Sequence, residues 1–88
     1  MGAAEIPYIT KERRSAIEVL GETPTTAGEL NFGLTKLVLR YLRLKGKSYM
    51  TFNDIVGALE QAKNEFQRRI VHPYEDLKIE ENGDVYDL

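Results

Sequence analysis

The sequence of 88 residues contains no cysteine and no tryptophan, and its one histidine is His72. Without cysteine there is no disulfide and no thiolate metal site, and one histidine cannot form a cluster, so we expect no metal and no cofactor. A folded chain of this length buries only about 60–65% of the surface that it exposes when unfolded. Because disulfides and metals are excluded as supports, we predict a homo-oligomer.

Long apolar runs are also missing, and no segment approaches the roughly 18 apolar residues of a membrane span. The first nine residues lack a basic region followed by an apolar stretch, so we expect no secretory signal. The net charge of −2 gives no reason to expect nucleic acid binding. The sequence therefore predicts a single cytoplasmic domain over residues 1–88, with no membrane partner.

Catalytic motifs are absent as well. The sequence has no Gly-x-Ser-x-Gly elbow, no phosphate-binding Gly-x-x-x-x-Gly-Lys-Ser/Thr loop and no His-Glu-x-x-His. His72 falls at a predicted helix end, where the helix dipole favours a cation, and this explains it better than a catalytic role. The acidic residues near the C-terminus do not follow the calcium-loop pattern, and we interpret them as solvated. We expect no enzyme activity.

Helical periodicity and capping signals divide the sequence into an extended arm, helices and linkers. Residues 1–9 are predicted as an extended arm, followed by a short helix over 11–20. A longer helix is predicted over 27–45, because Thr26 and Glu29 form a capping box with two reciprocal hydrogen bonds. This pattern places one long amphipathic helix in the first half of the chain.

A third helix is predicted over 52–72. Thr51 marks its start, with Asp54 in the capping-box position, and Pro73 ends or kinks it. The linker 47–50 is short, so we expect the second and third helices to pack as an antiparallel hairpin. The predicted fold class is therefore all-α: a small helical domain with a central antiparallel helix hairpin and a short N-terminal helix.

The tail over residues 74–86 is compatible with two structures. Pro73 followed by acidic residues favours a short fourth helix that ends near Asn82 and Gly83. The same Asn-Gly pair would also suit the type I′ turn of a β-hairpin. We favour the helix, because a two-stranded hairpin is marginal without packing partners. In either form the tail should be ordered and docked, since disorder goes with few aromatic and β-branched residues.

The helix over 27–45 is apolar around more than half of its circumference, whereas a surface helix needs a stripe of only about 100°. Phe32 and Leu39 lie roughly opposite its main apolar face. Either the chain itself packs on both sides of this helix, or one side contacts another subunit. We predict that Phe32 and Leu39 lie in the oligomer interface. The main face carries Leu30, Leu34, Leu37, Tyr41 and Leu44.

Several cations are candidates for binding an anion. Lys36 and Arg40 belong to the second helix, whereas Arg68 and Arg69 lie near the end of the third. They could meet across a subunit boundary and bind an anion there. One arginine guanidinium can donate two hydrogen bonds to the oxygens of a phosphate group. The alternative is a solvated basic face that pairs with the acidic tail. Lys63 lies on an apolar face, where a lysine either extends its ammonium to water or faces a ligand anion.

Polar and aromatic side chains complete the candidate ligand site. Asn31 and Thr35 lie one turn apart between apolar positions and need partners, which could be a ligand or a backbone carbonyl. Tyr74 and Tyr86 could stack on a base, although tyrosine is also a common interface anchor.

Two stretches of the sequence resemble a known family. They are the run 28–32 with Thr35-Lys36, and the stretch 68–86, which contains Pro-Tyr-Glu-Asp and ends in Glu-Asn-Gly-Asp-Val-Tyr. Together with the opening Pro7-Tyr8-Ile9, they resemble a family of small uncharacterised proteins of phages and bacteria. Members commonly have Tyr at the place of Phe32 and Ala at the place of His72.

The resemblance implies a phage or prophage setting and names no activity. We expect one of two binding functions. In the first, the protein sequesters a small anionic, nucleotide-derived molecule such as a host defence signal. In the second, it inhibits or adapts a host or phage protein through its helical surface.

Overall fold

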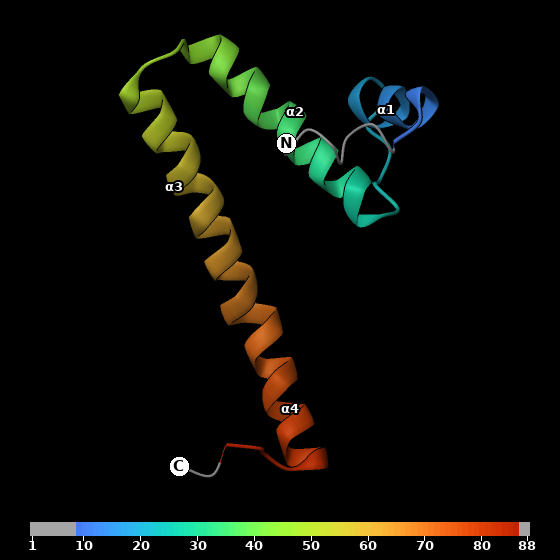
Figure 1. The fold of residues 1–88 in the computed structure, drawn as a ribbon, viewed down its shortest axis with the longest axis vertical. Helices are drawn as coiled ribbons and strands as arrows, with labels where there is room; N and C mark the ends of the chain where they lie inside the picture. The colour runs from blue at the N-terminus through green and yellow to red at the C-terminus, as the bar shows by residue number, and fades with distance from the viewer. Residues whose placement is uncertain (1–8, 87–88) are drawn as a thin grey trace. The chain divides into compact units, whose positions relative to one another are not determined.

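The computed structural model describes residues 9–86. Helices make up 78% of this part, which contains no strand, and this confirms the all-α class. The elements in chain order are α1 (Lys11–Glu18), α2 (Ala27–Lys45), α3 (Tyr49–Phe66), the π-helical turn η2 (Gln67–Val71) and α4 (His72–Asn82) (Figure 1). The arm predicted over residues 1–9 lies outside the described residues, except for Ile9. Within 9–86, no helix is long and apolar enough to cross a membrane.

The chain divides into two compact units, which are described separately. Unit 1 is Met1–Thr51 and contains α1, α2 and the first turn of α3. Unit 2 is Phe52–Leu88 and contains the rest of α3, η2, α4 and the tail. An antiparallel hairpin of α2 and α3 would require contacts between the two units, and it stays a prediction.

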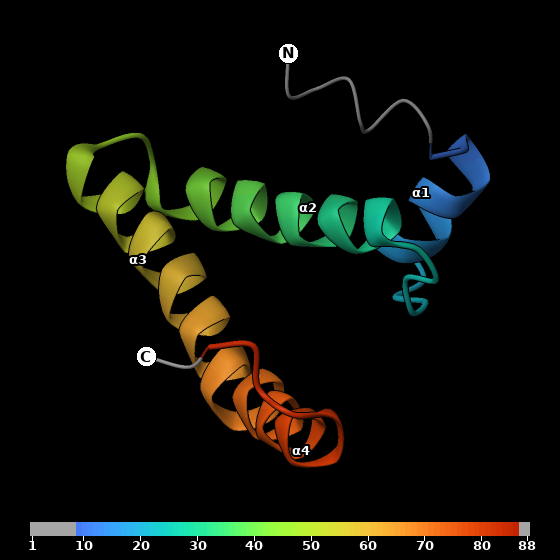
Figure 2. The ribbon, with the colours of Figure 1, turned by 60° about the horizontal axis from the view of Figure 1, so that its bottom comes forward.

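Unit 1 is built by α1 packing against α2, as Figures 1 and 2 both show. Its apolar core consists of Ile9 and Phe32, which are 5% and 4% exposed. The helices approach each other at Gly33, where an added Cβ would lie 3.5 Å from the Cγ2 atom of Ile17. One chain therefore already buries Phe32, which the sequence analysis placed in a subunit interface. Leu39 is half-buried, and its place in an interface stays a prediction.

A network of polar contacts around Glu29 joins α1 to the start of α2. The guanidinium of Arg13 on α1 donates from Nε and Nη2 to the two carboxylate oxygens of Glu29, at 3.0 and 2.8 Å. It also donates to Glu22 at 2.9 Å and to the carbonyl oxygen of Thr23 at 3.1 Å. Glu29 is only 7% exposed. This bidentate pair supplies directional contacts that a core of two apolar residues cannot provide.

The capping box predicted for α2 is half right. The hydroxyl of Thr26 accepts a hydrogen bond from the Glu29 N–H at 3.1 Å, as predicted. The Glu29 carboxylate, however, accepts from the N–H of Thr25 at 2.8 Å, and no return bond to Thr26 forms. The reason is Arg13, which holds the carboxylate on the side of α1. The bonds from Arg13 and from the Thr25 N–H lower the pKa of Glu29 to about 2.

The helix α3 begins at Tyr49, three residues earlier than predicted. Ser48, and not Thr51, provides the capping oxygen: its Oγ accepts from the Thr51 N–H at 3.1 Å. The Ser48 hydroxyl also donates to Thr51 Oγ1 at 3.1 Å, and Thr51 is 5% exposed. The cap is therefore the serine before the helix, and not the later threonine that was predicted.

Of the two outcomes predicted at Pro73, an end of the helix or a kink, the end does not occur. The segments α3, η2 and α4 follow one another without a gap from Tyr49 to Asn82, and this stretch is called the long helix below (Figure 2). In η2 the backbone widens, and the N–H of His72 donates to the carbonyl oxygen of Gln67. A wider turn before Pro73 relieves the clash that a proline ring makes in a regular α-helix. His72 therefore lies inside a helix and not at its end.

The fourth helix is confirmed, since α4 occupies the segment for which a β-hairpin was the alternative. It ends at Gly83, whose N–H donates to the carbonyl oxygen of Ile79 at 2.7 Å. Val85 and Tyr86 are 89% and 78% exposed, so docking of the tail on the helix hairpin or on a neighbouring subunit stays a prediction. The long helix is the only helix of the described part of unit 2, so no second helix of that unit is there to receive the tail.

We predict that Glu29→Gln lowers the melting temperature of unit 1 by several degrees at pH 7. The amide cannot accept two charge-assisted bonds from Arg13. A lowered pKa means that the carboxylate stabilises the fold above its unfolded value of 4.5 and stops doing so as the pH falls towards 2. The difference between the two proteins should therefore shrink over that range, as measured by circular dichroism melts.

The matched control is Glu22→Gln. Glu22 pairs with the same guanidinium, but its side chain is 51% exposed, and exposed pairs contribute little. Equal melting of the Glu29→Gln variant and the native chain at pH 7 would show that the pair does not hold unit 1 together.

We predict that Pro73→Ala raises the helical circular dichroism signal and the melting temperature of the long helix. Alanine restores a backbone donor and has the highest helix propensity, whereas proline costs about 3 kcal/mol in a regular helix interior. The gain should be smaller here, because η2 already accommodates the ring. Pro24→Ala, in the linker before α2, is the control and should leave the helical signal unchanged. A loss of helix in the Pro73→Ala variant would contradict this account.

Candidate functional site

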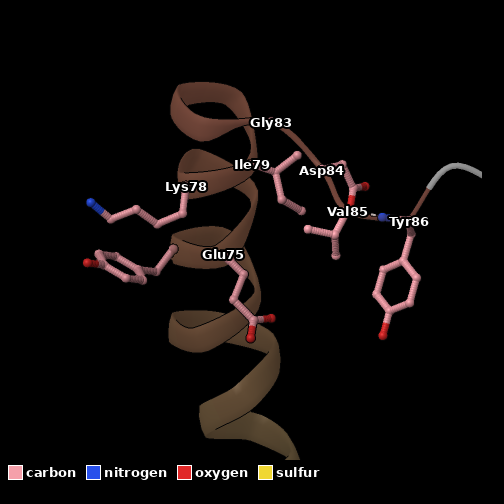
Figure 3. A pocket seen from close by; sticks show the side chains of 8 residues that line it. Glu75, Lys78, Ile79, Gly83, Asp84, Val85 and Tyr86 are labelled. Carbon is pink, nitrogen blue, oxygen red and sulfur yellow. Dashed lines mark hydrogen bonds between the residues drawn. The ribbon is translucent and has the colours of Figure 1, made fainter.

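In unit 2 a groove lies between α4 and the segment that follows it (Figure 3). It has a volume of about 390 Å³ and opens to solvent. Its lining combines apolar, aromatic and charged side chains. The lining residues are Tyr74, Glu75, Lys78, Ile79, Gly83, Asp84, Val85 and Tyr86.

The groove exists because the chain turns sharply after α4. Gly83 has φ 87° and ψ 159°, a conformation that is open to glycine and essentially closed to other residues. Directly after it, the Asp84 carboxylate accepts a hydrogen bond from the N–H of Tyr86 at 2.9 Å, which fixes the next turn. As a result, Val85 and Tyr86 lie along the side of α4 that carries Ile79 (Figure 3).

The charges of the groove do not favour an anion. Lys78 is its one cation, and the ammonium lies 5.4 Å from the ring centroid of Tyr74 and 3.4 Å from a carboxylate oxygen of Glu81. Glu75 and Asp84 also line the groove and contribute two carboxylates. The lining contains no histidine or cysteine, so the groove offers a surface for an apolar or cationic group and no nucleophile of that kind.

The structure brings two of the predicted ligand residues together, because Tyr74 and Tyr86 both line this groove. It does not do the same for the cations of η2. Arg68 donates to both oxygens of Glu65 at 2.9 Å, and Arg69 donates to one of them at 2.7 Å. These bonds lower the pKa of Glu65. Both guanidinium groups are thus paired with a carboxylate of the long helix, and the alternative pairing with the acidic tail does not occur within residues 9–86.

The remaining predicted cations are also held locally or lie apart. Lys63 contacts Glu60 at 3.3 Å and is 59% exposed, which agrees with an ammonium that reaches water. Lys36 contacts Glu18 of α1 at 3.3 Å, and its ammonium lies 5.9 Å from the ring centroid of Phe32. Lys36 thereby strengthens the contact between α1 and α2.

Three further candidate residues lie on α2 in unit 1. Asn31 and Arg40 are exposed, and Thr35 is half-buried. Because Arg68 and Arg69 belong to unit 2, their convergence with the α2 residues stays a prediction. No group of three or more side chains suited to a metal occurs within residues 9–86.

Sequence reasoning missed Lys78 and Arg13. Lys78 lies four residues after Tyr74, a spacing that places two side chains side by side on a helix, so this pair could have been found. Arg13 and Glu29 are far apart in the sequence, and no local pattern connects them. Only the packing of α1 on α2 reveals that contact.

Comparison with known proteins adds a family to this description. Residues 6–85 match a family model described as a domain of unknown function, DUF6899. The chain belongs to the DUF6899 family. This confirms the expectation of an uncharacterised family, and the match includes α1, α2, the long helix and most of the groove. No curated protein and no solved structure matches the chain.

We predict that Gly83→Val releases the tail from α4 in this DUF6899 protein. Valine cannot adopt the backbone angles of Gly83 without strain, so the turn that forms the groove should open. Nuclear Overhauser effects between Val85 and Ile79 report the closed turn and should disappear.

Gly57→Ala is the control, because Gly57 lies within α3 and an added Cβ there meets nothing within 4 Å. This change should keep the groove and stabilise the helix by about 0.5–1 kcal/mol. Unchanged Overhauser effects in the Gly83→Val variant would mean that the glycine does not form the groove.

Proposed function

We propose that this DUF6899 protein is a non-catalytic interaction protein that binds another protein chain along the apolar face of its long helix. The observation that supports this most is the lack of a core in unit 2. No residue of the described part of this unit, 52–86, is buried. A single helix gains most of its stability by packing an apolar face, so unit 2 needs a partner.

The face in question runs along α3 and into η2, and it is called the long-helix face below. Its side chains recur at intervals of three and four residues, which places them in one stripe. They are large and mostly accessible: Phe52 and Leu59 are each 43% exposed, Phe66 is 59% exposed and Ile70 is 56% exposed. The long-helix face consists of Phe52, Ile55, Val56, Leu59, Phe66 and Ile70, with Lys63 among them.

The energy available from this face is enough to hold a partner. Complete burial of a large aliphatic or aromatic side chain contributes about 1.5–3 kcal/mol, and burial of a half-exposed one contributes part of that. Several such side chains in one stripe can offset the cost of association. The helix-in-groove mode of recognition uses anchors at this same spacing.

The sequence resemblance gives this proposal a biological setting. We propose that the protein is encoded by a phage or prophage and acts in the host cytoplasm, where it inhibits or adapts a host or phage protein. A small protein without catalytic groups can act by covering a surface of another protein. An exposed apolar helix face is suited to such binding.

The second candidate function is the sequestration of a small anionic, nucleotide-derived ligand such as a host defence signal. Tyr74, Tyr86 and Lys78 around one groove favour it, because they offer aromatic faces and a cation. The carboxylates of Glu75 and Asp84 in the same groove oppose it. For this reason protein binding is the better supported function.

A photo-crosslinking amino acid in place of Phe66 tests the proposal in the bacterial host. It should form a covalent product with a protein chain upon irradiation. The same amino acid in place of Gln61, on roughly the opposite side of α3, should form far less product. Mass spectrometry of the product identifies the chain that was captured.

Native mass spectrometry of the purified native chain separates the two candidates. A retained nucleotide mass that disappears in a Tyr86→Ala/Lys78→Ala variant would favour sequestration. The absence of any protein product at position 66 would overturn the interaction proposal.

A further inference from the structure

We infer that the partner on the long-helix face is a second copy of this chain, which lies antiparallel to the first. This inference rests on the proposed function and names the chain that is bound on that face; a host or phage protein is then contacted by the pair, outside that face. It is carried by the charges at the two ends of the long helix, which are opposite in sign and separated by the helix itself.

The end at Tyr49 is basic. Arg43, Lys45 and Lys47 precede it directly and are exposed. None of the three forms an ion pair with another residue of the range 9–86. This group of three is called the basic end.

The other end is acidic. Within the described residues, only Glu81 of its five carboxylates forms an ion pair, with Lys78. These carboxylates lie on α4 and in the turn after it, where the helix dipole is also negative. The acidic end consists of Glu75, Asp76, Glu80, Glu81 and Asp84.

The two ends of one chain cannot neutralise each other. Phe52 and Glu75 belong to the same helical stretch of unit 2, in which a rise of about 1.5 Å per residue separates them by about 35 Å. Lys47 lies five residues before Phe52, and five residues of extended chain span at most about 18 Å. The charges of opposite sign within one chain are therefore kept apart by the length of that stretch.

A second copy in antiparallel orientation removes this separation. Its acidic end comes beside the basic end of the first copy, and a two-fold axis produces the same contact a second time. The helix dipoles are then also opposed favourably. In a parallel pair, each end would lie beside an end of like charge, which is unfavourable.

The long-helix face fits the same alignment. Its side chains recur at intervals of three and four, and an antiparallel copy in the register that joins the charged ends places Leu59 opposite Ile70 and Lys63 opposite Phe66. Lys63 is 59% exposed and its ammonium contacts Glu60, so its stem can cover the partner's Phe66 while the ammonium stays in water.

Sedimentation velocity of the full chain at micromolar concentration tests this inference. The native chain should sediment as a dimer whose dissociation constant rises with salt, because salt screens the charged ends. Arg43→Glu/Lys45→Glu/Lys47→Glu should raise that constant at least about tenfold, and so should Asp76→Lys/Glu80→Lys/Asp84→Lys. Circular dichroism verifies that both variants keep their helices.

Mixing the two variants is the decisive measurement. The end at Tyr49 then carries three carboxylates in the first variant, and in the second variant the α4 end carries four lysines against two carboxylates. The mixed antiparallel pair should therefore form far more tightly than either variant forms with itself. A chain that carries all six changes should also form dimers with itself. A native chain that stays monomeric, or variants that fail to complement each other, would overturn the inference.

These outcomes are separable from failure of the proposed function. If the native chain is monomeric and the crosslinker at position 66 captures a different protein, the antiparallel pair is wrong and the interaction function stands. If no protein is captured at position 66, both fail.

Discussion

The missing backbone donor of Pro73, together with the π turn that precedes it, is the constraint on which unit 2 depends. A proline in a regular helix interior would break the helix, and unit 2 would then consist of two short helices able to fold onto each other. Because η2 widens instead, α4 continues α3, and the unit has no second helix to cover its apolar side chains. Exposure of the long-helix face follows from this one local adjustment.

Unit 1 is also small, but its stability has a different source. Among its described residues, the apolar core is formed by Ile9 and Phe32, so polar contacts carry much of the packing specificity. Arg13 binds Glu29, and Lys36 binds Glu18, so each helix provides one cation and one carboxylate to the other. The unit is therefore held together by paired charges at both ends of a small apolar centre.

The sequence predicts those features that local chemistry determines. The bounds of α2 follow from Thr26 and Gly46, and the helical tail follows from its acidic first turn. Features that depend on distant contacts were missed. The cation that holds Glu29 comes from another helix, and burial of Phe32 requires α1 to lie on that side of α2. At Pro73 an end or a kink of the helix both stayed open, because sequence rules assume a regular α-helix, and a π turn relaxes the clash that they describe.

The π turn also acts as a one-residue insertion in the helical phase. Each residue of an α-helix advances by about 100°, so an extra residue in one turn rotates everything after it by roughly a quarter of a revolution. The side of α4 that bears the groove is thus set independently of the side of α3 that bears the long-helix face. Deletion of one uncharged residue of η2, such as Gln67, would keep the charges of the long helix and would turn Tyr74 and Lys78 to a different side of it.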